Sequence, residues 1–172
     1  GNIHFIGVSN WTTQRIEEAN KFAEENGMEP IRISQINYSL AHSSVETFGD
    51  NTLVCMDTKE FRWYKKHDFP VMAFSPQAKG FFAKLAKGDA ANNLPEGQYA
   101  GPANLARLAK VKQLSEQTGD TPAKITLGYL NSQPFFVSSV FAVTKLWQLD
   151  EDMEAQDLTY DPKTVAFLEN MI

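Results

Sequence analysis

The chain has 172 residues, a formal net charge of −5 and 42% hydrophobic residues. These values are typical of a soluble globular protein, and the length predicts about one domain. Asp and Glu (21) outnumber Lys and Arg (16), and the basic residues form no long run, which argues against nucleic-acid binding. No apolar stretch reaches the roughly 18 residues that span a bilayer, which argues against a membrane partner.

Cysteine content and the first residues bear on where the protein resides. Cys55 is the single cysteine, so an internal disulfide and a zinc site built from cysteine pairs are excluded. The first ten residues, GNIHFIGVSN, do not have the pattern of a secretory signal peptide, and we expect a cytoplasmic protein. Because the first residue is Gly and not Met, we expect a larger parent protein.

Apolar runs alternate with helical patterns four times along the chain. In the first half, Thr12 or Thr13 is the expected cap of one helix, and Gly27 is its expected end. A second helix is expected from Asp57, where Glu60 completes capping-box spacing. The predicted elements of this half are a strand at 3–8, a helix to Gly27, a strand at 31–38, a loop at 39–56 and a helix from Asp57.

The second half repeats the alternation. Its first strand ends before Pro76, since proline cannot continue a central strand. Thr121 and Pro122 have the cap and first-position pattern of a helix. The segment 88–102 is rich in Gly, Asn and Pro, and its length predicts a functional or mobile loop. The predicted elements are strands at 71–74 and 135–143, and helices at 78–87, 103–118, from 121, 145–155 and 162–170.

Strands that alternate with helices predict an α/β fold with parallel strands and right-handed crossovers. Two architectures compete. An open doubly wound sheet is disfavoured, because the turn at residues 7–11 lacks a Gly-rich phosphate-binding pattern. A complete (β/α)8 barrel needs at least about 200 residues and eight strands, whereas four strands are predicted. The fold class is therefore expected to be half a barrel, with four parallel strands and crossover helices.

Several segments resemble one known family. Residues 6–11, 34–40 and 73–76 resemble strands five, six and seven of the aldo-keto reductases, and Gln148-Leu149 resembles the family's eighth unit. The order and spacing agree across 1–172, so the chain is predicted to be a single partial domain, the C-terminal half of this TIM barrel. The resemblance implies an NAD(P)H-dependent carbonyl reductase as the intact protein.

The resemblance also implies which residues hold the nicotinamide end of the cofactor. Ser9, Asn10 and Gln35 are expected to hydrogen-bond the carboxamide, because amide side chains offer donors and acceptors together. The alternative is that Ser9 and Asn10 only cap the following helix. Phe74 stands where the family commonly has Tyr, and it is expected to stack on the ring, with Ser75 beside it. The alternative for Phe74 is a plain core aromatic.

At the adenosine end, the resemblance is weaker. Thr144 and Lys145 are expected to hold a phosphate near a helix N-terminus. Gln148 keeps the family residue, whereas Ala142 replaces a usual Gly and Asp152 replaces a usual Asn. Asp152 would place a negative charge near the phosphates of the cofactor. The alternative for most acidic residues between Asp150 and Asp161 is that they form a solvated helix face. The expected cofactor is NADP, with NAD as the other possibility.

No catalytic set is predicted within this chain. The family's catalytic Asp, Tyr, Lys and His all belong to the absent strands. His4 is expected to be structural, His42 has no acid at a suitable spacing, and His67 is expected at a helix C-terminus. Cys55 is expected to be buried filler. No catalytic residue and no metal site are therefore assigned here.

Two hypotheses follow for function. The first is the cofactor-binding half of an aldo-keto reductase-like oxidoreductase, with a nicotinamide nucleotide and a small carbonyl substrate as partners. The second is a non-catalytic nucleotide-binding or structural domain of a larger protein. An isolated half barrel leaves inward side chains uncovered, so a missing N-terminal half or a second copy is the expected protein partner. The strand residues that helices on one side are not expected to cover completely as a set are Ile3, Phe5, Ile33, Ile36, Val71, Ala73, Val137 and Phe141.

Overall fold

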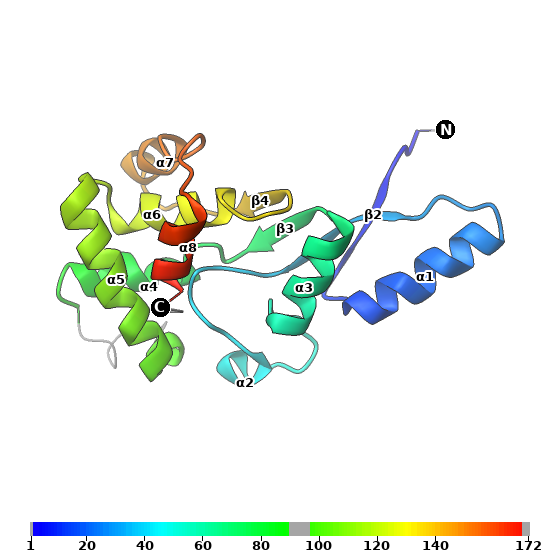
Figure 1. The fold of residues 1–172 in the computed structure, drawn as a ribbon, viewed down its shortest axis with the longest axis horizontal. Coiled ribbons are helices and arrows are strands. Elements are labelled where there is room, and N and C mark those ends of the chain that lie inside the picture. Colours follow the sequence, from blue (N-terminus) through cyan, green and yellow to red (C-terminus); the bar gives the residue numbers. More distant parts are fainter. Residues whose placement is uncertain (1, 90–96, 170–172) are drawn as a thin grey trace.

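The computed structural model describes residues 2–89 and 97–169 (Figure 1). Residues 90–96 of the predicted loop at 88–102 and the end of the last predicted helix lie outside these residues. The described chain contains one four-stranded sheet, in which consecutive strands are neighbours and all pairs are parallel. This is the predicted α/β half barrel. Its strands are β1 (Ile6–Ser9), β2 (Ile31–Asn37), β3 (Val71–Phe74) and β4 (Val137–Val140).

The helices begin at most of the predicted signals. Thr12, Thr121 and Asp161 each accept a hydrogen bond from the backbone N–H three residues on, which is the N-cap arrangement. The helices are α1 (Thr13–Glu25), α2 (Val45–Phe48), α3 (Thr58–His67), α4 (Phe81–Ala86), α5 (Pro102–Thr118), α6 (Pro122–Asn131), α7 (Leu146–Met153) and α8 (Pro162–Leu168), with short 3-10 turns η1 (Ala78–Gly80) and η3 (Gly97–Tyr99).

Four predicted elements differ from the structure. The first strand begins at Ile6, because residues 2–5 extend past the sheet without a partner strand. The fourth strand has four residues and not nine. The helix predicted at 78–87 is interrupted, since Lys79 and Gly80 have positive φ angles that an α-helix cannot contain. The predicted loop at 39–56 also includes α2.

One face of the sheet is covered by helices. The register places Ser34 beside Val71 and Ile36 beside Ala73, and all four side chains are fully buried. They belong to, or lie beside, a core built with aromatic and aliphatic side chains of α3, α4, α5 and α6. Figure 1 shows α1 and α3 at one end of the molecule and α4, α5, α6 and α8 gathered at the other.

The opposite face is open. The prediction that helices on one side cannot cover all of these strand residues is confirmed: Ile36, Val71, Ala73 and Val137 lie in or against the core, whereas Ile3 and Phe5 are exposed. Side chains alternate along a strand, so the residues between them face the other way. The partly exposed residues of that open face are Ile33, Gln35, Met72, Phe74 and Ser138.

Apolar side chains are also exposed at the two edges of the sheet. Before β1, Ile3 and Phe5 are 77% and 71% exposed, as the prediction for the uncovered side chains expected. At the β4 edge, Val140 is 38% exposed, and Phe136 just before the strand is 62% exposed. Both free edges of the half barrel therefore carry apolar surface that solvent contacts.

A buried carboxylate ties the start of α1 to α3. The Asp57 side chain accepts a hydrogen bond from the Glu60 N–H at 2.8 Å, as predicted. The Glu60 carboxylate does not complete the capping box, because it accepts from the Thr13 N–H (3.0 Å) and hydroxyl (3.3 Å) instead. Burial raises the pKa of Glu60 above its ordinary 4.5, against the opposing effect of the Thr13 N–H. This contact anchors the first turn of α1, directly after the end of β1.

The raised pKa predicts a pH-dependent stability. Between pH 4.5 and the raised value, folded Glu60 binds more protons than unfolded Glu60, so its contribution to the free energy of unfolding falls as pH rises. Glu60→Gln removes this fall. Urea unfolding at about pH 4.5 and about pH 7 should show the variant gaining stability relative to wild type at the higher pH. Glu24→Gln, at an exposed site on α1, is the control; a constant Glu60→Gln difference would contradict the prediction.

Candidate functional site

Three of the predicted cofactor residues meet where β1 and β2 end. The Ser9 hydroxyl donates to the Gln35 side-chain oxygen at 3.3 Å, and the Asn10 N–H donates to the Gln35 backbone oxygen at 2.9 Å. The cap of α1 is Thr12, so neither Ser9 nor Asn10 caps that helix. Their cofactor role stays a prediction, and the structure brings them into one group.

Asn10 is held in a conformation that few residues adopt. Its φ is 55°, in the left-handed region, and its side-chain oxygen accepts from the Val54 N–H at 3.2 Å. That bond fixes the side chain and occupies its acceptor. Within the described part of the chain, the side-chain NH2 groups of Asn10 and Gln35 donate to no protein atom. The group thus presents donors for an external amide oxygen.

Phe74 lies on the open face at the end of β3. It is partly exposed and lies outside the buried core, which does not favour the plain core alternative. The buried Asn37 donates to the Phe74 backbone oxygen at 3.4 Å and accepts from the Ser43 hydroxyl at 2.6 Å. Asn37 thereby joins the ends of β2 and β3, and it holds the Phe74 backbone beside the Gln35 group.

The turn after β3 is strained. Ser75, Ala78 and Lys79 are non-glycine residues with φ angles of 52°, 48° and 56°, and Gly80 follows at 81°. Such conformations cost on the order of 1 kcal/mol or more each and occur mostly where a turn serves a site. The Ala78 N–H donates to the Ser75 oxygen at 2.9 Å, which closes the turn.

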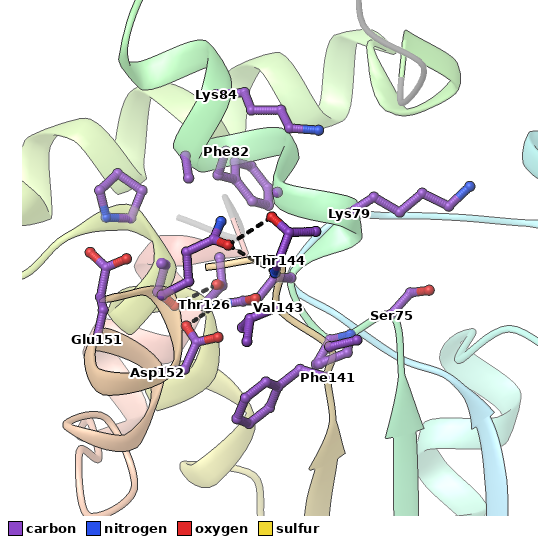
Figure 2. Close-up of a pocket in the computed structure, with 18 of the residues that line it drawn as sticks. Ser75, Lys79, Phe82, Lys84, Thr126, Phe141, Val143, Thr144, Glu151 and Asp152 are labelled. Carbon is purple, nitrogen blue, oxygen red and sulfur yellow. Dashed lines mark hydrogen bonds between the residues drawn. The ribbon is translucent and has the colours of Figure 1, made fainter. Parts of the chain in front are cut away.

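A cavity of about 590 Å³ lies between this turn and α7 (Figure 2). Figure 2 shows side chains from the β3–α4 turn, from α4 and from α7 around it. It brings together predicted residues from segments about seventy positions apart in the sequence. Among the predicted residues, Ser75, Thr144, Gln148 and Asp152 line this cavity, whereas Lys145 is exposed and does not.

Gln148 occupies the first N–H groups of α7. Its side-chain oxygen accepts from the Thr144 N–H (3.1 Å), the Thr144 hydroxyl (3.1 Å) and the Lys145 N–H (3.0 Å). These are the donors that were expected to hold a phosphate. In the structure they are satisfied by the protein itself, which speaks against the phosphate role predicted for Thr144 and Lys145.

Asp152 is buried at the cavity wall. It is 5% exposed, and its Oδ1 accepts from the Gln77 side chain at 2.7 Å. Burial raises the pKa of Asp152, the Gln77 hydrogen bond lowers it, and the neighbouring Glu151 raises it further. The alternative of a solvated acidic face is wrong for Asp152, because this carboxylate is inside.

Charges of both signs line the cavity. In Figure 2, Lys79 and Lys84 lie across the cavity from Glu151 and Asp152. Lys87 also lines the cavity, and its ammonium lies 5.3 Å from the centre of the Trp147 ring. The basic wall belongs to the β3–α4 turn and α4, and the acidic wall belongs to α7.

Sequence reasoning missed the basic and aromatic part of this wall. The missed residues are Gln77, Lys79, Lys84, Lys87 and Trp147. The run Ser-Pro-Gln-Ala-Lys-Gly after a strand signals a turn, but its distance from α7 along the chain hides the contact between Gln77 and Asp152. For Trp147, a position on a helix does not indicate that a cavity lies beside the side chain.

The remaining candidates lie elsewhere. His67 ends α3, as predicted, and His4 precedes β1. Cys55 is buried, and burial raises the pKa of its thiol. Across residues 2–89 and 97–169, no three His, Cys, Asp or Glu side chains gather to hold a metal ion. In the same ranges, no helix has the length and apolar character needed to cross a bilayer.

Comparison with known proteins identifies the class. The model of the Aldo/keto reductase family matches residues 1–172, and the chain belongs to this family. It is 22% identical to L-glyceraldehyde 3-phosphate reductase of Escherichia coli K12, over 100% of this chain and 50% of that protein. It is also 22% identical to Protein tas of the same organism, over 98% of this chain and 48% of that protein. The chain thus spans about half the length of the curated relatives it matches.

Proposed function

We propose that the chain is the cofactor-binding half of an NAD(P)H-dependent reductase that acts on a small carbonyl compound. One observation carries the proposal: the amide group at Asn10 and Gln35, the exposed ring of Phe74 and the cavity beside Ser75 all lie where the strands end. In (β/α)8 barrels, this end of the strands is the ligand-binding end. Membership of the family makes oxidoreductase activity the expected chemistry.

Different residues of the site would bind different parts of the nucleotide. The free NH2 groups of Asn10 and Gln35 suit the carboxamide oxygen of nicotinamide, and Phe74 offers a ring face for stacking. The diphosphate suits the basic wall that includes Lys79 and Lys87. The bound cofactor supplies the hydride. The chain's own residues orient the nicotinamide and exclude water from one of its faces.

The open sheet face supports a second part of the proposal. Four parallel strands with two free edges and a partly exposed inner face correspond to half of a closed barrel. We infer that a second four-stranded half covers this face. In the intact protein this would be the N-terminal half of the barrel, and for the chain alone a second copy would serve.

A non-catalytic nucleotide-binding or structural domain remains the second candidate. The buried Asp152 and the internally satisfied start of α7 favour it, because both depart from an open phosphate site. The two candidates differ in a measurable way. The full-length protein should oxidise a reduced nicotinamide nucleotide when an aldehyde is added if it is the reductase, and only bind the nucleotide, or bind none, otherwise.

Nucleotide binding should depend on Gln35. Gln35→Ala removes a donor from the carboxamide and is expected to weaken binding to the full-length protein by about 1 to 3 kcal/mol, which is roughly fivefold to a hundredfold in affinity. Titration followed by fluorescence quenching measures the change. Gln113→Ala, at an exposed site on α5, should have no effect. If neither NADH nor NADPH binds to the wild-type protein, the proposal is wrong.

A further inference from the structure

Helix α7 carries an exposed apolar stripe. Leu146, Leu149 and Met153 are three and four positions apart, a spacing that places them on the same side of an α-helix. All three side chains are exposed, and Leu146 is 81% exposed. A helix of a folded domain normally turns its apolar side toward other elements of the protein. The stripe is therefore a surface that calls for a partner.

The other sides of α7 are already in contact with the protein. Gln148 and Asp152 face the chain: Gln148 accepts from the N–H groups of the two residues before the helix, and Asp152 accepts from Gln77 at 2.7 Å. Trp147 and Glu151 line the cavity beside α4. The helix thus turns polar side chains toward the protein and apolar side chains toward solvent, which is the reverse of the usual arrangement.

Contacts with α6 hold α7 in this orientation. The Lys124 ammonium of α6 forms an ion pair with Glu154, the residue directly after α7. Asn131, at the end of α6, donates to the Ala155 backbone oxygen at 2.9 Å. Figure 1 shows α7 at the outside of the molecule, next to α6. A rotation of α7 that buried the stripe would bring the buried carboxylate of Asp152 into solvent and break its bond to the protein, so a partner is expected to cover the stripe instead.

The place of α7 in the fold indicates which partner this is. α7 follows β4, an edge strand whose one neighbour in the described sheet is β3. In a (β/α)8 barrel the helices form an outer ring around the strands, so a strand that pairs with the free edge of β4, and the helix that follows that strand, come next to α7. The chain spans 50% and 48% of the two curated relatives. The other half of such a barrel therefore has the size and the place to cover the stripe.

We propose that the stripe of Leu146, Leu149 and Met153 is the docking surface of α7 for the other half of the barrel, whose strand beside β4 and adjoining helix cover it. The inference rests on the proposed function, in which that half covers the open inner face of the sheet, and it adds a second contact on the helix side. Apolar side chains of that half remove the stripe from water. The two halves are then held together at the inner face and at α7.

The test compares the reaction of two introduced thiols in the full-length protein. Leu146→Cys places a thiol on the stripe, and Leu105→Cys places one on α5, where the native side chain is 44% exposed against 81% for Leu146. Both are labelled with a maleimide, and the labelling of wild type, in which Cys55 is buried, is subtracted. From exposure in this chain alone, Leu146→Cys would react faster. We expect the opposite order, with Leu146→Cys at least about tenfold slower, because a covered thiol reacts only when the contact opens.

A second variant guards against a local change at Leu146. Met153→Cys, two turns along the same stripe, should be protected in the same way. Labelling of both stripe thiols as fast as Leu105→Cys, or faster, would overturn the inference. Protection that is lost on dilution would also overturn it, since a second copy would then be what covers the stripe. Titration of the wild-type protein with NADH and NADPH tests the proposed function separately: binding with an unprotected stripe removes only this inference, and a protected stripe without binding removes only the cofactor role.

Discussion

The 172-residue chain by itself is expected to reduce no aldehyde with NADH or NADPH above background. Carbonyl reduction needs a proton donor beside the reacting oxygen, and such a group contributes about a hundredfold to ten-thousandfold in rate. The groups described at the strand ends are amides, hydroxyls and a phenyl ring, and none of these side chains is a general acid near neutral pH. The side chains concerned are Ser9, Asn10, Gln35, Phe74 and Ser75.

The measurement is the fall in absorbance of the reduced nucleotide, followed with an aldehyde at increasing concentration. The full-length protein is the positive control, since the chain spans about half the length of its relatives. Saturable nucleotide oxidation by the purified 172-residue chain would contradict the prediction. It would mean that this half contains its own proton donor.

In solution, the chain by itself is expected to be a dimer of about twice 19.3 kDa. The free edges are β1 and β4, each of four residues, and a two-fold rotation about the barrel axis places β1 of one copy beside β4 of the other. Pairing of both edges would satisfy the unpaired backbone groups and cover the open face. Exposed apolar residues at both edges, such as Ile3 and Val140, add to the driving force.

Light scattering coupled to size-exclusion chromatography measures the mass at tens of micromolar protein. Ile6→Lys, on the β1 edge, should shift the chain toward monomer or aggregate, because it places a charge in the proposed contact. Met28→Lys replaces an equally apolar, exposed residue in the loop after α1 and should leave the mass unchanged. A compact wild-type species of 19.3 kDa that unfolds cooperatively would refute the proposed dimer.

The sequence predicted the architecture because strands and helix starts depend on patterns of nearby residues. Apolar runs predicted parallel strands, and Thr12 and Thr121 predicted helix starts, since a cap depends only on the next three residues. Four strands in about half the length of a barrel predicted a half barrel. Strand ends were less well predicted, because pairing with neighbours, and not the run itself, sets where β1 and β4 begin.

Which face of the sheet is covered could not be predicted from the apolar pattern. When both faces of a strand are apolar, alternation carries no direction, so the sequence does not show that Ile36, Val71 and Ala73 lie on the covered side. Only the packing of the helices decided it. The register between strands then followed from the same packing.

Some features of the candidate site could likewise be predicted from the sequence, and others could not. The positions of Ser9, Asn10 and Gln35 near strand ends could be predicted from the family pattern and from their place after the apolar runs. The hydrogen bonds of Gln77 to Asp152 and of Gln148 to the start of α7 could be found only in the folded chain. The physical reason is distance along the chain and side-chain direction: the Gln77–Asp152 bond joins residues 75 positions apart, and no local pattern encodes such a contact.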